Sequence, residues 1–138
     1  MKSAFYKTFI ITFLASIFVL TGCTKYDDGP FFSFRTKTGR LEGEWKLVKL
    51  NGSEIKSSDD QLYYEFDKEG KCIVTHEYGD DSFSDEGTWE WESSKEVIEI
   101  KMVFQGEVQS IDYTVFRLTY NELWVEDADN NELEFEKQ

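Results

Sequence analysis

The sequence predicts an all-β domain in which eight antiparallel strands close into an up-and-down barrel. From Leu41 onward, apolar and polar residues alternate with a period of two, which is typical of half-buried strands. Clusters of Gly, Asn and Asp interrupt the alternation about every eight to twelve residues, as turns between short strands do. No long helical period follows the first 22 residues, so parallel crossovers are excluded and the sheet is expected to be antiparallel.

Eight segments carry the alternating pattern. We expect strands at 44–50, 61–66, 71–78, 82–92, 96–104, 108–118, 122–126 and 132–136. A flat sheet of these strands would leave an unpaired edge on each side, and closure into a barrel removes both edges. The barrel is therefore favoured over a sandwich.

Turn residues support these boundaries. Asn51-Gly52 ends the first strand, and 67–70 (Asp-Lys-Glu-Gly) is typical of a tight hairpin in which Gly70 adopts a positive φ. Among the connections, only 53–60 has room for a helical turn.

The alternation also predicts which side chains point inward. We expect the inward set to be Leu62, Tyr64, Phe66, Cys72, Val74, His76, Tyr78, Trp89, Trp91, Ile98, Ile100 and Met102. Within 108–118 the apolar face changes, because Ile111, Tyr113 and Val115 share one face. Phe116 and Leu118 share the other, so a β-bulge is expected to switch the register there.

The first 22 residues are arranged like a secretory signal. Lys2 and Lys7 precede an apolar run at 9–20, and the small pair Thr21-Gly22 follows it. A helix of this run would cover about 18 Å, well short of the ~30 Å hydrocarbon core, so we do not expect it to remain as a transmembrane anchor.

The next residues predict a lipid anchor. Leu20-Thr21-Gly22-Cys23 resembles the bacterial lipobox, which implies that Cys23 receives a diacylglycerol thioether, becomes the first residue after cleavage and carries acyl chains such as palmitate. Thr24 does not fit the inner-membrane retention signal of enteric bacteria, which favours the outer membrane. Residues 25–28 are similar to the export signal of Bacteroidetes surface lipoproteins, but a solvated linker explains them as well. Periplasmic and cell-surface exposure therefore both stay open.

These observations divide the chain into three regions. They are a signal peptide at 1–22, a lipidated cysteine and tether at 23–40, and a barrel domain at 41–138. The tether carries the only proline and has no clear period. Its cluster of Phe31, Phe32 and Phe34 is expected to lie against the domain or in the lipid interface.

Charge and cysteine content restrict the partners. The chain has 15 basic and 28 acidic residues, and removal of the signal would take away only bases, so it repels nucleic acid and anionic headgroups. The acids also serve to keep a surface protein soluble. With Cys23 acylated, only Cys72 remains, so no intramolecular disulfide is expected.

The sequence offers little for catalysis, and we expect no catalytic residue, metal or cofactor. His76 is the sole histidine, and on a strand its Cα would lie about 13 Å from that of Cys72, too far for one metal ion. Residues 127–131 have a D-x-D-x-N spacing but lack the glycine and distal glutamate of a calcium loop. They are explained as a hairpin turn, and the protein is not expected to be an enzyme.

Several motifs together point to a family. Gly43-Glu44-Trp45 resembles the G-x-W motif that opens the first strand of lipocalins. "YEFDKEGKCIV", "GTWEWESSKEVIEI" and "RLTYNELWV" are similar to the F-D-x-x-G hairpin, the later G-x-W and the L-T-x-x-x-L hairpin of small bacterial lipocalin-like lipoproteins. The resemblance runs from Leu41 to Phe135. It implies an eight-stranded barrel whose closed end is plugged by Trp45, although the sequence reveals no counterpart of the arginine that covers this tryptophan in larger relatives.

Two functions stay open from the sequence. Eight strands enclose an interior that is either able to hold one small ligand or filled by side chains. In the first case, a small apolar or aromatic molecule would be bound by Tyr64, His76, Trp89, Trp91, Met102 and Tyr113. In the second, the barrel is filled, and a non-enzymatic envelope lipoprotein binds a protein or glycan partner through its loops.

Overall fold

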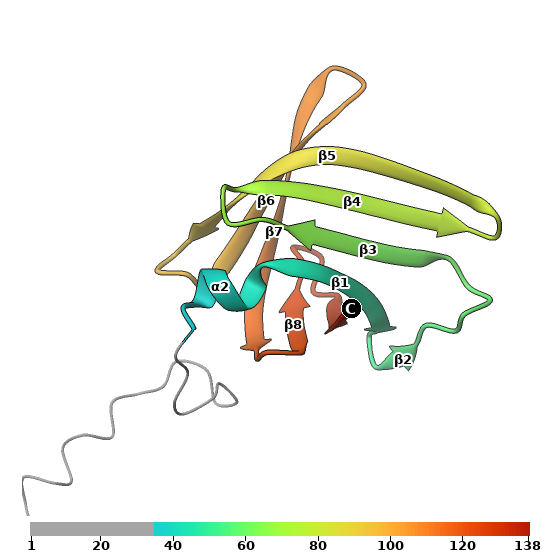
Figure 1. Cartoon of the computed structure of the whole chain (residues 1–138), viewed down its shortest axis with the longest axis horizontal. Helices are drawn as coiled ribbons and strands as arrows, with labels where there is room; N and C mark the ends of the chain where they lie inside the picture. The colour runs from blue at the N-terminus through green and yellow to red at the C-terminus, as the bar shows by residue number, and fades with distance from the viewer. Residues whose placement is uncertain (1–34) are drawn as a thin grey trace, which may run out of the picture.

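A short helix and nine strands make up the part of the chain that the computed structural model describes, residues 35–138 (Figure 1). The elements are α2 (Lys37–Leu41), β1 (Gly43–Leu50), β2 (Ser53–Glu54), β3 (Gln61–Phe66), β4 (Lys71–Tyr78), β5 (Asp81–Glu92), β6 (Val97–Phe104), β7 (Glu107–Leu118), β8 (Glu122–Glu126) and β9 (Glu132–Lys137). The strands from β3 to β9 follow one another beside β1, and β9 pairs back onto β1. Eight strands therefore close into the predicted antiparallel barrel, and β2 is a short addition to β1.

The strand boundaries follow the sequence pattern closely. Each predicted strand is confirmed, and its ends differ from the prediction by no more than one residue. The connection 53–60 differs, because β2 and turns occupy it in place of a helical turn. Asn51 and Gly52 both have positive φ, so the chain reverses sharply and Ser53–Glu54 pairs with the end of β1.

The predicted register change in β7 is confirmed. Its pairing with β8 shifts between Val115 and Arg117. The bulge places Phe116 outside, 48% exposed, while Val115 and Leu118 on either side are both buried. A second shift, between Leu47 and Lys49 of β1, was not predicted.

The barrel has two different ends, a closed end and an open end. At the closed end lie α2 and the turns 67–70, 93–96 and 119–121. At the open end lie the connections 51–60, 79–80, 105–106 and 127–131. The β4–β5 and β6–β7 hairpins extend away from α2 in different directions at the open end (Figure 1).

Helix α2 belongs to the folded domain, so the described end of the predicted tether is not extended. The Thr36 hydroxyl caps the helix by accepting a hydrogen bond from the Gly39 N–H, and Leu41 is fully buried. The predicted signal peptide, Cys23 and the Phe31 to Phe34 cluster lie outside the described residues. Within residues 35–138 no helix is long and apolar enough to cross a membrane.

The G-x-W motif organises the closed end. Trp45 is fully buried, and its indole N–H donates a 2.7 Å hydrogen bond to the Leu41 carbonyl. The ammonium of Lys137 lies 4.9 Å from the centre of the Trp45 ring, a cation–π contact that takes the place of the covering arginine. Gly43 has a φ of 122°, and a Cβ there would lie 2.7 Å from Cε of Lys137. The motif needs its glycine because the lysine stem crosses this position.

Gly43→Ala should therefore destabilise the barrel. We expect the free energy of unfolding to fall by about 1–3 kcal/mol, because alanine tolerates neither the positive φ nor the close lysine stem. Urea denaturation followed by tryptophan fluorescence measures the change. Gly39→Ala is the control, since Gly39 lies in α2 without a positive φ. Equal effects of the two variants would contradict this explanation of the motif.

Candidate functional site

A cluster of aromatic rings fills the middle of the barrel. Tyr64 stacks on Phe66 at 5.8 Å and meets Tyr113 and Phe135 edge-on at 6.0 and 5.5 Å. All four side chains are buried. The arrangement leaves Tyr64 and Tyr113, two of the predicted ligand-binding residues, packed against protein on several sides.

The hydroxyl groups of Tyr64 and Tyr113 form a hydrogen bond with each other. Their oxygens are 3.0 Å apart in the buried interior. Burial, the largest cause, raises the pKa of both phenols, so both stay neutral at physiological pH. Because a buried hydroxyl without a partner costs about 1–3 kcal/mol, the pair stabilises the filled core as a unit.

The two predicted tryptophans of β5 lie toward the closed end. Trp89 is buried and donates from its indole N–H to the Asp67 carbonyl at 2.9 Å. Trp91 meets Trp89 edge-on at 6.0 Å and donates to the Thr38 hydroxyl of α2 at 3.2 Å. Both indoles therefore fasten closed-end segments to the barrel.

His76 and Met102, the remaining predicted residues, lie nearer the open end and are half-buried. The strand register sets Leu62, His76 and Phe83 side by side across β3, β4 and β5. Residues directly opposite in antiparallel strands share a face, so these side chains lie on the inward face that includes Tyr64. The six predicted residues are thus divided among the packed middle of the barrel, its closed end and its open end.

A group of incompletely buried apolar and aromatic side chains forms what we call the mouth cluster: Leu62, His76, Tyr78 and Phe83. His76 stacks on Tyr78 at 6.2 Å, and Tyr78 lies 6.4 Å from Phe83. Tyr78 is 46% exposed and Phe83 is 61% exposed. Phe83 was missed from the sequence because its inward neighbours along β5, Asp81 and Asp85, are charged. The available signal was its even spacing from Trp89, which places both side chains on the same face of β5.

The barrel wall is interrupted beside this cluster. Gly87 and Met102 form the pair nearest the open end between β5 and β6. Beyond it, β5 pairs only with β4, and β6 pairs only with β7. The two hairpins diverge from this point (Figure 1), so the inward face of 81–86 is not covered by β6.

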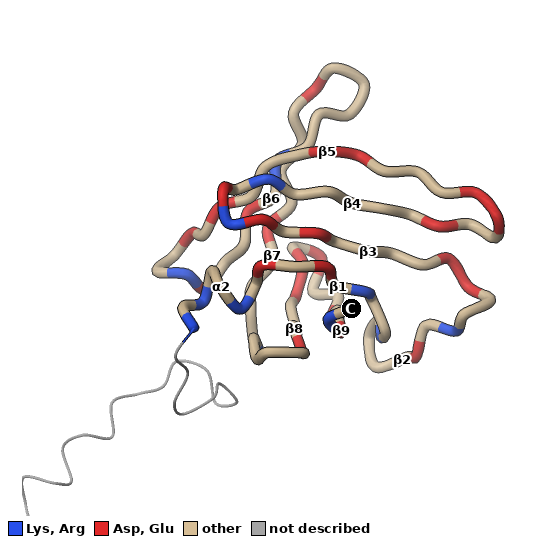
Figure 2. The backbone as a smooth tube through the Cα atoms, in the orientation of Figure 1, with Lys and Arg blue, Asp and Glu red and all other residues tan. Residues whose placement is uncertain are grey.

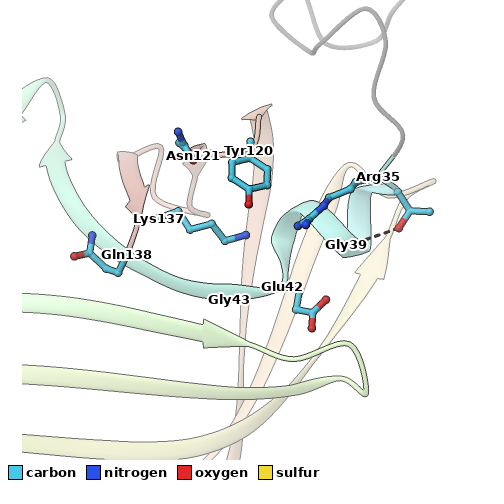
Figure 3. Close-up of a pocket in the computed structure, with 9 residues that line it drawn as sticks. Arg35, Gly39, Glu42, Gly43, Tyr120, Asn121, Lys137 and Gln138 are labelled. Atoms are coloured by element: carbon cyan, nitrogen blue, oxygen red, sulfur yellow. Dashed lines mark hydrogen bonds between the residues drawn. The ribbon is translucent and has the colours of Figure 1, made fainter.

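A hollow of about 890 Å³ lies at the opposite, closed end (Figure 3). It is lined by Arg35, Thr36, Gly39, Glu42, Gly43, Tyr120, Asn121, Lys137 and Gln138. Its lining is largely polar, and it lies outside the barrel core. Sequence reasoning missed it, because α2, the β7–β8 turn and the end of β9 meet only in the folded chain.

Side chains of the metal-ligating kind are dispersed within residues 35–138. No group of three or more His, Cys, Asp or Glu side chains there is placed to hold a metal ion. The predicted hairpin turn at 127–131 is held by the Asp127 carboxylate, which accepts from the Asn131 side chain and from the Asn131 and Asp129 backbone N–H groups. These hydrogen bonds, chiefly those of Asn131, lower the pKa of Asp127.

Comparison with known proteins places this geometry in context. Residues 41–125 match the family model described as a lipocalin-like domain. A lipocalin-like protein from Bacteroides uniformis has a similar structure, with a TM-score of 0.57 and 19% identity over 72% of this chain and 100% of that one. A protein from Bacteroides eggerthii also has a similar structure, with a TM-score of 0.54 and 13% identity over 71% of this chain and 99% of that one. No curated protein matches the sequence.

The packed interior predicts an inert thiol. Cys72 is fully buried, and burial, together with Asp67 and Glu65, raises its pKa to about 12. We expect Ellman's reagent at pH 8 to label the folded chain far more slowly than the chain in guanidinium chloride, because the reactive thiolate is absent. In a Cys23→Ser chain, this measurement reports Cys72 alone. Rapid labelling without denaturant would contradict the packing described here.

Proposed function

The chain belongs to the lipocalin-like family, and from this premise we propose that it is a non-enzymatic binding protein that holds a small apolar or aromatic molecule at its open end. Members of the family are generally binding proteins rather than enzymes. The identity of the ligand is not contained in the fold, so its chemical class must be argued from the side chains.

The mouth cluster is the observation that carries the proposal. Phe83 and Tyr78 face inward by register, and yet they are 61% and 46% exposed. Covering such rings with an apolar ligand is favourable by about 25 cal/mol per Å² of apolar surface removed from water. The interrupted pairing between β5 and β6 leaves this surface accessible from the side.

The filled interior restricts the proposed ligand in size. The Tyr64–Tyr113 pair and the rings around it occupy the middle of the barrel, so a ligand would rest above them. We therefore assign ligand contact to Met102 and to the mouth cluster, which includes His76. Structural roles are assigned to Tyr64, Tyr113, Trp89 and Trp91.

A second function, binding of an envelope protein through exposed loops, is favoured by the β6–β7 hairpin. Val103 and Val108 are directly paired on its outward face, and they are 63% and 69% exposed. Exposed apolar residues gathered at a projecting hairpin are typical of surfaces that contact another protein. This function requires no ligand at the mouth.

We further propose that the protein is attached to the outer membrane through acyl chains on Cys23. The support is the sequence of residues 20–23 and the signal-like segment before it. Two or three acyl chains make a stable anchor without a spanning helix.

The mouth can be tested with N-phenyl-1-naphthylamine, a neutral aromatic probe whose fluorescence rises on burial. Using a Cys23→Ser chain that starts at residue 23, we expect the probe to bind and Phe83→Ala to raise its Kd by about tenfold, because one large apolar contact is lost. Phe116→Ala is the matched control, since Phe116 is exposed on the outward face. Absence of binding, or equal weakening by both variants, would favour the protein-binding alternative.

The anchor has a direct test. In cells fed labelled palmitate, the chain should carry the label, and Cys23→Ala should abolish it because no other thiol occupies the lipobox position. Cys72→Ala, which removes the only other cysteine, should leave the label unchanged. Label retained in Cys23→Ala would exclude the proposed attachment site.

A further inference from the structure

Strand β5 has a backbone edge at 81–86 that no other strand within residues 35–138 covers. The pairing between β5 and β6 ends at Gly87 and Met102, and beyond this point β6 pairs only with β7. The β4–β5 and β6–β7 hairpins diverge here (Figure 1). Residues 81–86 are all exposed, so this part of β5 lies at the border of a sheet that is otherwise closed by β1 and β9.

The backbone groups of Ser82, Ser84 and Glu86 point to this edge. Hydrogen-bonding positions alternate along an antiparallel strand, so every second residue bonds to the same neighbour. The Trp89 N–H donates to the carbonyl of Gly70, just before β4, at 2.8 Å. The register with β4 is continuous from 81 to 88, so the odd-numbered residues bond toward β4. The even-numbered residues therefore present their N–H and C=O groups to the side that β6 leaves, where a further strand can pair with them.

The side chains along the edge are acidic. Segment 72–94 contains no Lys or Arg, and acids lie at the tip of its hairpin and along β5 (Figure 2). Lys71 forms an ion pair with Glu86 at 3.0 Å. Asp81 and Asp85 have no ion-pair partner within residues 35–138. Negative charge at the edge is therefore only partly offset by the described chain.

These charges determine which strand can be added. A second copy of this chain is disfavoured, because antiparallel pairing of two 81–86 segments brings acids together. A basic strand meets opposite charges instead. Asp81, Phe83 and Asp85 share the inward face of β5, since successive side chains of a strand alternate. The complementary strand thus carries a cation, an apolar residue and a cation at the matching positions.

We propose that the β5 edge at 81–86 binds an extended basic segment of another protein, which adds a strand to the sheet. In such strand addition the backbone hydrogen bonds supply affinity, and alternate side chains supply specificity. The acids also keep the free protein from pairing with itself. The inference goes beyond the functions proposed above, because it uses backbone groups of β5 that neither of them involves.

The test is a calorimetric titration of the full-length chain, in a maltoside detergent, with the capped peptide Lys-Arg-Thr-Val-Thr-Lys. Antiparallel to β5, its Arg, Val and final Lys face Asp85, Phe83 and Asp81. We expect binding that weakens as sodium chloride is added. The peptide Glu-Glu-Thr-Val-Thr-Glu is the control and should not bind. Absence of binding by the basic peptide, or equal binding by both peptides, overturns the proposal.

Methylated peptides separate strand addition from simple attraction between charges. The N–H of the first Thr, opposite Ser84, faces the edge, so its methylation should raise the Kd by about tenfold. The N–H of the Val, opposite Phe83, faces away from β5. Methylation there is the matched control, because it adds the same group and leaves the pairing with β5 intact. Equal effects of the two methyl groups overturn the proposal, and this comparison uses the unaltered protein.

Variants of the protein test the same contact from the other side. The N–H of Ser84 points away from β4, so Ser84→Pro leaves the β4–β5 ladder intact and should raise the Kd by about tenfold. Ser84→Ala is the control, since it also loses the hydroxyl contact with Thr75 but keeps the N–H. Equal Kd values for the two variants, both shown to be folded by circular dichroism, overturn the proposal.

Two further measurements address charge and self-association. Asp85→Asn should raise the Kd by about threefold, whereas Asp112→Asn, exposed on the outward face of β7, should leave it unchanged. Equal effects of these two variants contradict the assigned position of the strand. Analytical ultracentrifugation of the free chain should show a monomer. A dimer that Ser84→Pro abolishes assigns the edge to a second copy and overturns the proposal.

Discussion

The pairing of β1 with β9 is the constraint on which the rest of the structure depends. It closes the sheet and removes the two edges that eight short strands would otherwise expose. The same pairing sets Trp45 directly opposite Lys137, so barrel closure itself brings the ammonium to the indole. Gly43 allows the lysine stem to cross β1, and α2 then covers the remaining side of Trp45. Closure, the G-x-W motif and the closed-end hollow are therefore consequences of one strand pairing.

A small barrel with many aromatic residues has little interior left for a ligand. Tyr64, Phe66, Tyr113 and Phe135 pack ring against ring where larger barrels enclose a cavity. Packing at this density stabilises the fold. Because the middle is filled, a ligand could be bound only at an end of the barrel or on its outer surface. Within residues 35–138, the mouth cluster is a place where apolar side chains suited to a ligand remain accessible.

Local patterns predicted the strands well, because alternation and turn chemistry are properties of neighbouring residues. Even the bulge near Phe116 could be predicted, since its apolar residues change face within one strand. The sites depend on contacts between distant segments, which a period-two pattern does not report. Lys137 was therefore not recognised as the cover of Trp45, and Trp91 was expected at a ligand rather than at Thr38 of α2. Phe83 was missed because charged neighbours obscured its face.

The distribution of charge makes the two ends chemically different. Open-end connections carry acids such as Asp60, Asp80 and Asp129, whereas Arg35 and Lys137 meet at the closed end. Charges on exposed loops are screened beyond about 8 Å at physiological ionic strength, so each end acts mainly on molecules in contact with it. An anion is then disfavoured at the acidic open end, whereas a neutral apolar molecule there can be covered by the exposed aromatic rings. The side chains and charges at each end, rather than the filled middle, therefore determine which molecules the barrel can contact.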